Sequence, residues 1–229
     1  TDDSDWEDAE YYLGSWEDGS MKTGWQKITV YDQDEDDDYD YWFNFKSNGE
    51  KRTRTDNNAK DKDIYEKKIN GKYYGFDKRG VMTYEWTATT ESDLSTISNW
   101  RYFNSPEDGA RSTKGWFKVV AAEYLNYEKN NDGEDAWYYA DGSGNLYAGE
   151  FKTVKGKKYA FRNDGRMVDG LKFIKENGMD VRADDDDEHA FDTEDDFIES
   201  AQYYNANDYL CYYFGDSSDG AMKTNKTNI

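Results

Sequence analysis

The chain has 229 residues, of which 50 are acidic and 29 are Lys or Arg, so its formal net charge is −21. This charge argues against binding to nucleic acid or to an anionic membrane surface. No apolar stretch approaches the length of about 18 residues that a transmembrane helix needs, so membrane insertion is not expected. The chain starts with Thr in an acidic segment, so no signal peptide is expected. His189 and Cys211 are single residues of their kind, which excludes multi-histidine metal sites and an intrachain disulfide.

Aromatic residues make up an unusual share of the apolar content. Trp, Tyr and Phe account for 17% of the chain, while all hydrophobic residues together account for 35%. An ordinary globular core consists mostly of Leu, Ile and Val. The composition therefore predicts many small aromatic clusters in place of one aliphatic core, and it argues against a disordered chain.

One pattern recurs along the chain: an aromatic cluster, a polar turn that ends in Gly, and often Met followed by Gly-Trp. It begins with "EYYLGSWEDGSMKTGWQKI" from Glu10 and returns as "GKYYGFDKRGVMTYEW" from Gly71. Later copies include "KKYAFRNDGRMVDGLKFI" from Lys157 and "CYYFGDSSDGAMKT" from Cys211. The turn glycines are Gly19, Gly49, Gly80, Gly109, Gly144, Gly165 and Gly220.

Each copy is interpreted as a β-hairpin, because aromatic runs favour strands and the glycines accept the positive φ of a turn. An isolated hairpin is marginal in water, whereas stacked copies cover one another's aromatic faces. We therefore predict an all-β solenoid of stacked hairpin repeats that forms a single repeat domain over 1–229. The predicted hairpin units are 9–30, 40–55, 69–87, 100–120, 135–154, 155–174 and 208–224. The predicted insertions between them are 31–39, 56–68, 88–99, 121–134 and 175–207.

The insertions are predicted to be exposed loops, and two of them are strongly acidic. "YDQDEDDDYD" starts at Tyr31 and "ADDDDEHAFDTEDD" starts at Ala183. In the second, a short helix is expected after Thr193, which is a preferred N-cap residue and has Asp196 three positions on.

The repeats resemble the cell-wall-binding repeats of Gram-positive surface proteins, a group that includes choline-binding modules and glucan-binding repeats. The resemblance lies in "MKTGWQKI", "INGKYYGFDKRGVM", "KGKKYAFRNDGRM" and "DGAMKT", and it extends over nearly the whole chain in seven copies. It implies a spiral of hairpins that binds a ligand and does not catalyse a reaction. In choline-binding members, the Trp of Gly-Trp and the first aromatic residue of the next hairpin form two walls, and an aromatic residue or Met closes the cage.

Carried onto this chain, the resemblance implies three candidate cages. Their walls are Trp25 with Trp42, Trp86 with Trp100, and Trp116 with Trp137. The candidate closing residues are Tyr73 or Met82 for the first, Trp137 or Tyr138 for the second, and Tyr159 or Met167 for the third. A quaternary ammonium suits such a site because it has no hydrogen to donate and is recognised by aromatic faces. Other copies depart from the pattern: Arg54-Thr55, Glu150-Phe151 and Gly170-Leu171 stand where Gly-Trp is expected.

Other readings of the sequence remain open. The aromatic residues are equally consistent with simple packing inside the stack, and the acidic loops with a solvated surface. No cofactor is expected, and weak Ca²⁺ binding is the one metal interaction that the acidic loops permit. A Cys211–His189 pair is the sole candidate for nucleophilic catalysis, but Cys211 stands at a structural aromatic position of its repeat.

The sequence thus predicts a noncatalytic binding or adhesion module. Its expected partner is choline on teichoic acid or a polysaccharide of the cell envelope, and its expected location is the cell surface or the secreted fraction, as one segment of a longer protein. The alternative is a structural spacer or adhesin segment with degenerate sites that binds a protein partner through its acidic loops. A hydrolase that uses acidic residues is the remaining alternative.

Overall fold

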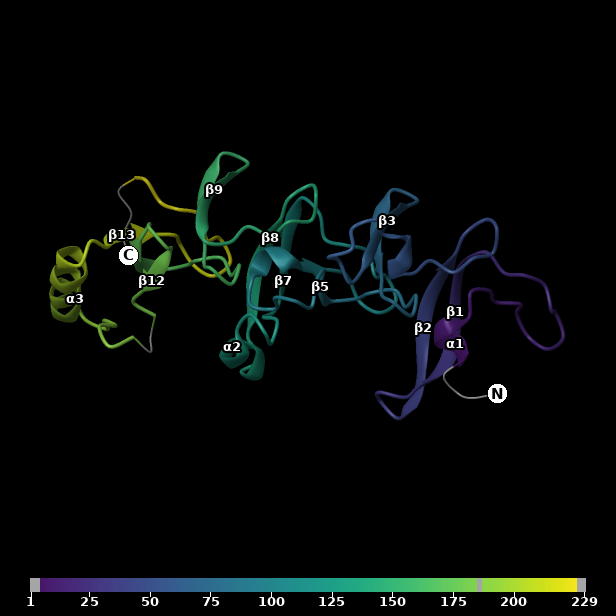
Figure 1. Ribbon diagram of the computed structural model, residues 1–229. Coiled ribbons are helices and arrows are strands. Elements are labelled where there is room, and N and C mark those ends of the chain that lie inside the picture. Colours follow the sequence, from purple (N-terminus) through teal and green to yellow (C-terminus); the bar gives the residue numbers. More distant parts are fainter. Residues whose placement is uncertain (1–4, 185–186, 226–229) are drawn as a thin grey trace. The chain divides into compact units, whose positions relative to one another are not determined.

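The computed structural model describes residues 5–184 and 187–225, and its contacts divide the chain into two compact units, Thr1–Thr113 and Lys114–Ile229 (Figure 1). The first unit contains α1 (Asp5–Asp8), β1 (Gly24–Asp32), β2 (Asp37–Phe45), β3 (Tyr65–Ile69), β4 (Lys72–Phe76), β5 (Trp86–Ala88) and β6 (Trp100–Tyr102). The second contains β7 (Gly115–Val120), α2 (Tyr127–Asn131), β8 (Asp135–Ala140), β9 (Glu150–Val154), β10 (Lys157–Phe161), β11 (Leu171–Lys175), β12 (Asp180–Arg182), α3 (Glu194–Ala206) and β13 (Leu210–Tyr213).

The strands pair as a succession of antiparallel hairpins. In the first unit β1 pairs with β2, β3 with β4 and β5 with β6. In the second unit β7 pairs with β8 and β9 with β10, while β11 pairs with both β12 and β13. The predicted class, an all-β fold of hairpin repeats with loop insertions, is therefore confirmed within each unit. No helix in the described part of the chain is long and apolar enough to cross a membrane.

The observed hairpins begin and end at different residues from the predicted units. The β1–β2 and β7–β8 hairpins each run from a Gly-Trp strand to the next aromatic strand, and a turn glycine follows the second strand. Beyond the glycine the chain makes a single β-bridge, as between Phe76 and Met82 or between Phe161 and Met167. The predicted unit 40–55 thus holds the second strand of a hairpin, a turn and a bridge, and 69–87 holds β4, a turn, a bridge and the start of β5. The predicted insertions 31–39, 88–99 and 121–134 contain the connections within hairpins.

Two short connections show why the paired strands meet where they do. Asn70-Gly71 joins β3 to β4 with φ of 49° and 87°, and Lys155-Gly156 joins β9 to β10 with φ of 47° and 80°. A two-residue loop with positive φ at both positions is the type I′ turn, whose twist matches that of the flanking strands. These two connections therefore set the register of the β3–β4 and β9–β10 hairpins.

The core consists of several small clusters, as the aromatic composition predicts. In the first unit, Phe43 and Phe45 of β2 are buried with Val30, Tyr41 and Val81. In the second unit, one cluster gathers around Phe161 and another around Phe214, both of which are fully buried. Aromatic faces thus take the place of a continuous aliphatic core.

A third cluster of the second unit lies under α3, the helix predicted after Thr193. The Thr193 hydroxyl accepts a hydrogen bond from the Asp196 backbone N–H, which confirms the predicted cap. The ring of Tyr204 on α3 stacks on Phe173 of β11 with centroids 4.7 Å apart, and α3 lies beside β12 and β13 (Figure 1). The insertion 175–207 therefore caps the β11 sheet and is not a simple loop.

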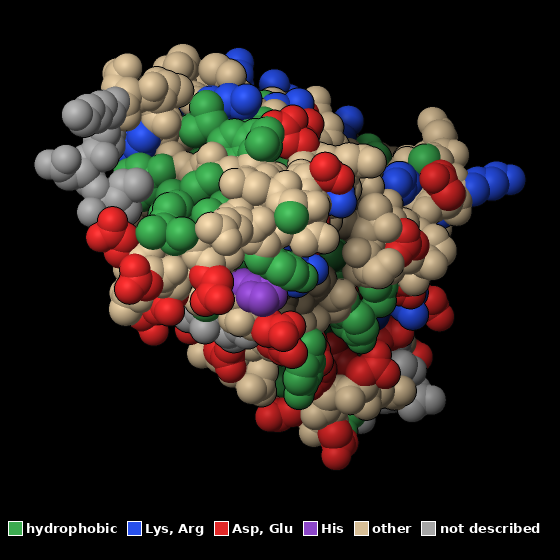
Figure 2. All heavy atoms as spheres, turned by 90° about the vertical axis from the view of Figure 1, so that its left-hand side faces the viewer, with side chains coloured by type: hydrophobic (Ala, Val, Ile, Leu, Met, Phe, Trp, Pro, Cys, Tyr) green, Lys and Arg blue, Asp and Glu red, His purple; other side chains and the backbone are tan. Residues whose placement is uncertain are grey.

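The acidic residues of this insertion face solvent. Asp192, Glu194, Asp195 and Asp196 are all exposed. Figure 2 shows many acidic side chains at the surface in its view. The strong negative charge of the chain is therefore displayed at its surface, where it attracts cations and repels polyanions.

One member of the other acidic run is buried. Asp32 is 2% exposed, and its carboxylate accepts hydrogen bonds from the Tyr41 hydroxyl at 2.6 Å and from Arg79 at 2.9 Å. The Arg79 guanidinium in turn lies 5.5 Å from the Trp6 ring centroid and 5.6 Å from that of Tyr41. The hydrogen bond from Tyr41, with a further contribution from Arg79, lowers the pKa of Asp32 from 3.8 to about 2.

We expect the Asp32 carboxylate to make the free energy of unfolding depend on pH in the acidic range. A carboxyl group with a depressed folded-state pKa contributes its full stabilisation above the unfolded pKa, near 4, and loses it as the pH falls through the folded value. Asp32→Asn should lower the free energy of unfolding by about 1–2 kcal/mol at pH 7, and the difference from the wild type should shrink towards pH 2. Urea unfolding across this range measures it, with exposed Asp38→Asn as the control. A difference that does not change with pH would contradict this assignment.

Candidate ligand-binding site

Consecutive hairpins are joined by a recurring hydrogen bond. At three single bridges, and at Met222, a backbone N–H donates to a carbonyl of an earlier hairpin. Four such bonds within the units reach a residue in a paired strand: Met82 to Trp42 at 2.9 Å, and Arg111 to Tyr73, Met167 to Trp137 and Met222 to Lys158, each at 2.8 Å. Each bond marks a contact between stacked hairpins, which we name by its acceptor: the Trp42, Tyr73, Trp137 and Lys158 seams. The first two lie in the first unit and the last two in the second.

The strand register gives every seam the same four positions. One position is the acceptor, the residue whose carbonyl accepts the seam hydrogen bond. A second position, the first wall, lies on the partner strand of the same hairpin, opposite the residue two places after the acceptor. Trp25 thus pairs with Asn44, two residues after Trp42, and Trp116 pairs with Tyr139, two residues after Trp137. Residues two apart on a strand share a face, so the first wall and the acceptor lie on one side of their hairpin. The third position belongs to the next hairpin, and the fourth is the bridge residue itself.

In the Trp42 seam these positions bring three rings and a Met together. The indoles of Trp25 and Trp42 stand nearly perpendicular, at 84°, with centroids 6.4 Å apart. Tyr74 of the next hairpin contacts Trp25 at 4.7 Å, and Phe76 lies behind it at 5.8 Å. Met82 is buried at the fourth position. The two indoles thus form two sides of a corner.

The Trp137 seam repeats this geometry with different residues. Trp116 and Trp137 stand at 88° with centroids 6.4 Å apart. Tyr159 contacts Trp116 at 4.8 Å, and Phe161 lies behind it at 5.8 Å. The fourth position is again a buried Met, Met167. We refer to these two sites as the Trp25 cage and the Trp116 cage. Two segments with different loops thus give the same arrangement.

The Met side chains are held by turn glycines of a later repeat. A Cβ on Gly109 would overlap the thioether of Met82, and a Cβ on Gly220 would overlap that of Met167. Both glycines also have positive φ, of 57° and 55°. The glycines predicted as turn residues thus have a second role, because each leaves room for the Met that forms the base of a cage.

The indoles of both cages keep part of their surface in contact with solvent. Trp25, Trp42, Trp116 and Trp137 are each half-buried, in contrast to the fully buried Phe76 and Phe161 behind them. At the rim of the Trp25 cage, the carboxylate of Glu107 accepts hydrogen bonds from Lys27 at 2.7 Å and from the Trp42 indole N–H at 3.4 Å. The bond from Lys27 lowers the pKa of Glu107, so this rim group is ionised at neutral pH.

The structure brings together most of the residues predicted for the first and third cages. One closing residue of the first cage differs by one position from the prediction. Tyr74, not Tyr73, contacts Trp25. Side chains alternate along a strand, so Tyr73 points to the opposite face of β4, where Arg111 covers its ring at 4.2 Å. In the third cage the predicted Tyr159 and Met167 both lie at the site.

The second predicted cage is not assembled within one unit. Trp86 contacts Tyr102 at 5.2 Å, and Trp100 is buried, with its indole N–H donating to the Leu94 carbonyl at 3.0 Å. Its proposed closing residues, Trp137 and Tyr138, belong to the other unit, so a ligand site there stays a prediction. Tyr138 is 1% exposed and stacks on Phe117, which leaves it no free ring face.

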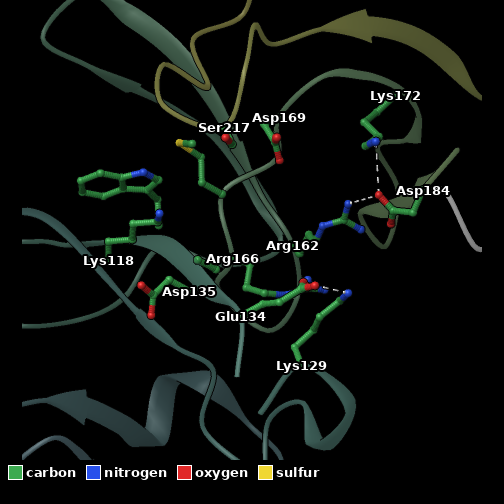
Figure 3. Close-up of a pocket in the computed structure, with 13 residues that line it drawn as sticks. Lys118, Lys129, Glu134, Asp135, Arg162, Arg166, Asp169, Lys172, Asp184 and Ser217 are labelled. Carbon is green, nitrogen blue, oxygen red and sulfur yellow. Dashed lines mark hydrogen bonds and ion pairs between the residues drawn. The ribbon is translucent and has the colours of Figure 1, made fainter. Parts of the chain in front are cut away.

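A polar cleft of about 550 Å³ adjoins the Trp116 cage, with Trp137 and Met167 in its lining (Figure 3). Across it, Lys129 pairs with Glu134 at 3.3 Å, and Asp184 pairs with Arg162 at 2.7 Å and Lys172 at 3.3 Å. Most of the charges in this cleft are therefore paired, and it offers hydrogen-bonding groups on one flank of the aromatic site. Among the described residues, no group of three or more His, Cys, Asp or Glu side chains could hold a metal ion.

The two remaining seams lack a Trp pair. In the Lys158 seam the first wall is Phe151, the third position is Tyr212, 5.2 Å from Phe151, and the acceptor is a lysine. In the Tyr73 seam the first wall is Glu66, and the fourth position is Arg111. Both seams thus carry cationic side chains where the cages have a Trp or a Met.

Comparison with known proteins gives matches only at the level of structure. No protein-family model matches the chain, and no curated protein does. The modular autolysin LytC from Streptococcus pneumoniae is 20% identical over 96% of this chain, with a TM-score of 0.45. Choline binding protein F from Streptococcus pneumoniae is 19% identical over 96% of this chain and 78% of its own, with a TM-score of 0.42. The choline binding domain of Spr1274 from the same organism is 25% identical over 48% of this chain and 98% of its own, with a TM-score of 0.30.

Choline-binding proteins are thus among the structures that this chain resembles. This is the family that its repeats also resemble. The chain spans about a third of the autolysin, 32% of its length. At these TM-scores the likeness by itself assigns no ligand, so the chemistry of the site rests on the chain's own residues.

Proposed function

We propose that the chain is a noncatalytic cell-surface module that binds quaternary ammonium groups, specifically choline on teichoic acid, through the Trp25 and Trp116 cages. The observation that carries the proposal is the recurrence of one geometry. Two perpendicular indoles with centroids 6.4 Å apart, a Tyr at 4.7 or 4.8 Å and a buried Met occur in both units. Packing alone does not require half-exposed indoles at the same four positions twice.

The chemistry of the cages suits an ammonium ligand. A trimethylammonium group has no N–H to donate, so it is recognised by the negative faces of aromatic rings, each contact contributing about 0.5–2 kcal/mol. The soft thioether of Met adapts to a methyl group at the base. The net charge of −21 further favours a cationic group over an anionic one. At the Trp25 cage, the carboxylate of Glu107 pairs with Lys27 and accepts from the Trp42 indole N–H, which helps to fix that indole at the rim.

This function implies an extracellular location, with the cell envelope as the partner. Two weak sites on one chain suit a surface that displays choline many times, because the second site then binds at a high effective concentration.

A second candidate is binding to an envelope polysaccharide. The polar cleft beside Trp137 supports it, because a sugar can stack on an indole face while its hydroxyls bond to neighbouring Arg, Lys and Asp groups. In this case the Trp116 cage, which has the cleft, should bind more strongly than the Trp25 cage.

Titration with choline tests the proposal. In calorimetry, each of Trp25→Ala and Trp116→Ala should remove one choline site and its share of the indole fluorescence change. The control is Trp16→Ala, because Trp16 is 102% exposed and lies outside both cages. The uncharged isostere 3,3-dimethylbutanol should bind about 10-fold more weakly than choline, since it lacks the cation.

Each alternative gives a different result. No saturable response to choline would refute the ammonium proposal. Binding of a glucan panel that Trp116→Ala abolishes would support the polysaccharide candidate, and turnover of a polysaccharide by the purified chain would show an enzyme. Binding of neither choline nor glycans would favour the spacer that contacts a protein through its acidic loops.

A further inference from the structure

Internal cations occupy the seams that lack a Trp pair. In the Lys158 seam, the ammonium of Lys158 lies 4.6 Å from the ring centroid of Phe151, the first wall. In the Tyr73 seam, the guanidinium of Arg111 lies 4.2 Å from the ring centroid of Tyr73, the acceptor. Both distances are within the range of about 6 Å over which a cation is attracted to an aromatic face.

These cations take positions that belong to the cages. Lys158 is the acceptor residue of its seam and so corresponds to Trp42 and Trp137. Arg111 is the bridge residue of its seam and corresponds to Met82 and Met167. In these two seams, a cationic side chain of the protein therefore contacts the aromatic ring that an ammonium ligand would contact in the cages.

The two seams differ in how their cation is held. Arg111 is 9% exposed and donates to the carboxylate of Glu66, which replaces the first-wall Trp, so this cation is locked by an ion pair. Lys158 is exposed and forms no ion pair among the described residues. Within the described part of the chain, the contact with the Phe151 ring is what holds the Lys158 ammonium in its seam.

We propose that the Lys158 seam is a masked third site for quaternary ammonium, occupied by the Lys158 side chain. The remaining parts of a cage are present: Phe151 and Tyr212 are half-buried with centroids 5.2 Å apart, Phe214 lies behind Phe151 at 6.2 Å, and Met222 is at the base. Lys158 excludes an external cation by occupying the ring face and by repelling like charge. The proposal rests on the ammonium-binding function of the two cages.

Lys158→Trp tests it, because this change removes the internal cation and supplies the missing second wall. In calorimetry, Lys158→Trp should show one choline site more than the wild type. In a Trp25→Ala/Trp116→Ala background, Lys158→Trp should likewise add one site, with quenching of the new indole. Lys158→Met, which removes the charge without adding a ring, should open the same site with lower affinity.

Lys157→Trp is the matched control. Lys157 precedes Lys158 on β10 and points to the opposite face, where it pairs with Asp219 at 3.4 Å. The Lys157→Trp variant adds an indole outside the seam, so the number of choline sites that it shows should equal that of the wild type. If both Lys158 variants bind the same number of choline molecules as the wild type, the masked site is refuted. A wild type that binds no choline refutes the function of the cages instead, so the two failures are distinguishable.

Discussion

Trp25→Ala combined with Trp116→Ala is expected to abolish retention of the protein on a surface that displays choline, while each single change lowers its apparent affinity about 100-fold. Each substitution removes the wall that contacts both the acceptor indole and the Tyr of its cage. With one cage left, the chain loses the gain from two linked contacts but keeps a weak single site. Surface plasmon resonance on immobilised choline at several densities measures the effect.

Two features of this measurement separate avidity from damage to the fold. The wild type should dissociate more slowly as the choline density rises, whereas the single variants should show no density dependence. Trp16→Ala should behave like the wild type, since Trp16 lies in neither cage. If one single variant loses all retention and the other loses none, only one cage binds, and a bivalent attachment is ruled out.

Much of the fold and of the two cages follows from sequence patterns. The repeated aromatic and Gly segments predict stacked hairpins, and the pairs Trp25 with Trp42 and Trp116 with Trp137 lie together as expected. The closing Tyr depends on strand parity: it stands two residues before the Phe that ends its strand, as Tyr159 does before Phe161. Applied to the first cage, the same count gives Tyr74, two residues before Phe76, and not the predicted Tyr73.

Other features depend on contacts between segments far apart in the chain. The glycine turns look like hairpin turns because Gly accepts positive φ in both settings, and only pairing shows that Asn70-Gly71 closes a hairpin while Gly80 precedes a bridge. Likewise, a lysine in an acidic protein gives no local sign of lying on a ring. Lys158 is recognised as an internal cation only from the β9–β10 register, which places it at the position of Trp42 and Trp137, and from its distance to the Phe151 ring.

The seams also explain why stability and binding are linked in this fold. In each of the four seams one backbone N–H donates to an earlier hairpin, so the bond that stacks two hairpins also fixes the base of the site between them. In the cages the residue is a Met adaptable enough to meet a ligand, and in the Tyr73 seam it is an Arg that pairs with Glu66. The residues at the bridge and acceptor positions together therefore distinguish a binding seam from a structural one, since the Lys158 seam keeps Met222 at the first of these positions but has a lysine at the second.

Gly109→Ala and Gly220→Ala are each expected to lower the free energy of unfolding by about 2–4 kcal/mol, the sum of left-handed backbone strain and overpacking. Both glycines have positive φ, and an added Cβ would displace Met82 or Met167, so choline affinity at the corresponding cage should fall too. Gly133→Ala is the matched control, because Gly133 has φ of 68° but open space around its Cβ position. It should lose only about 1–2 kcal/mol, with both cages intact. Urea unfolding and choline titration measure these effects, and equal losses in all three variants would mean that the Met–Gly contacts contribute nothing to the seams.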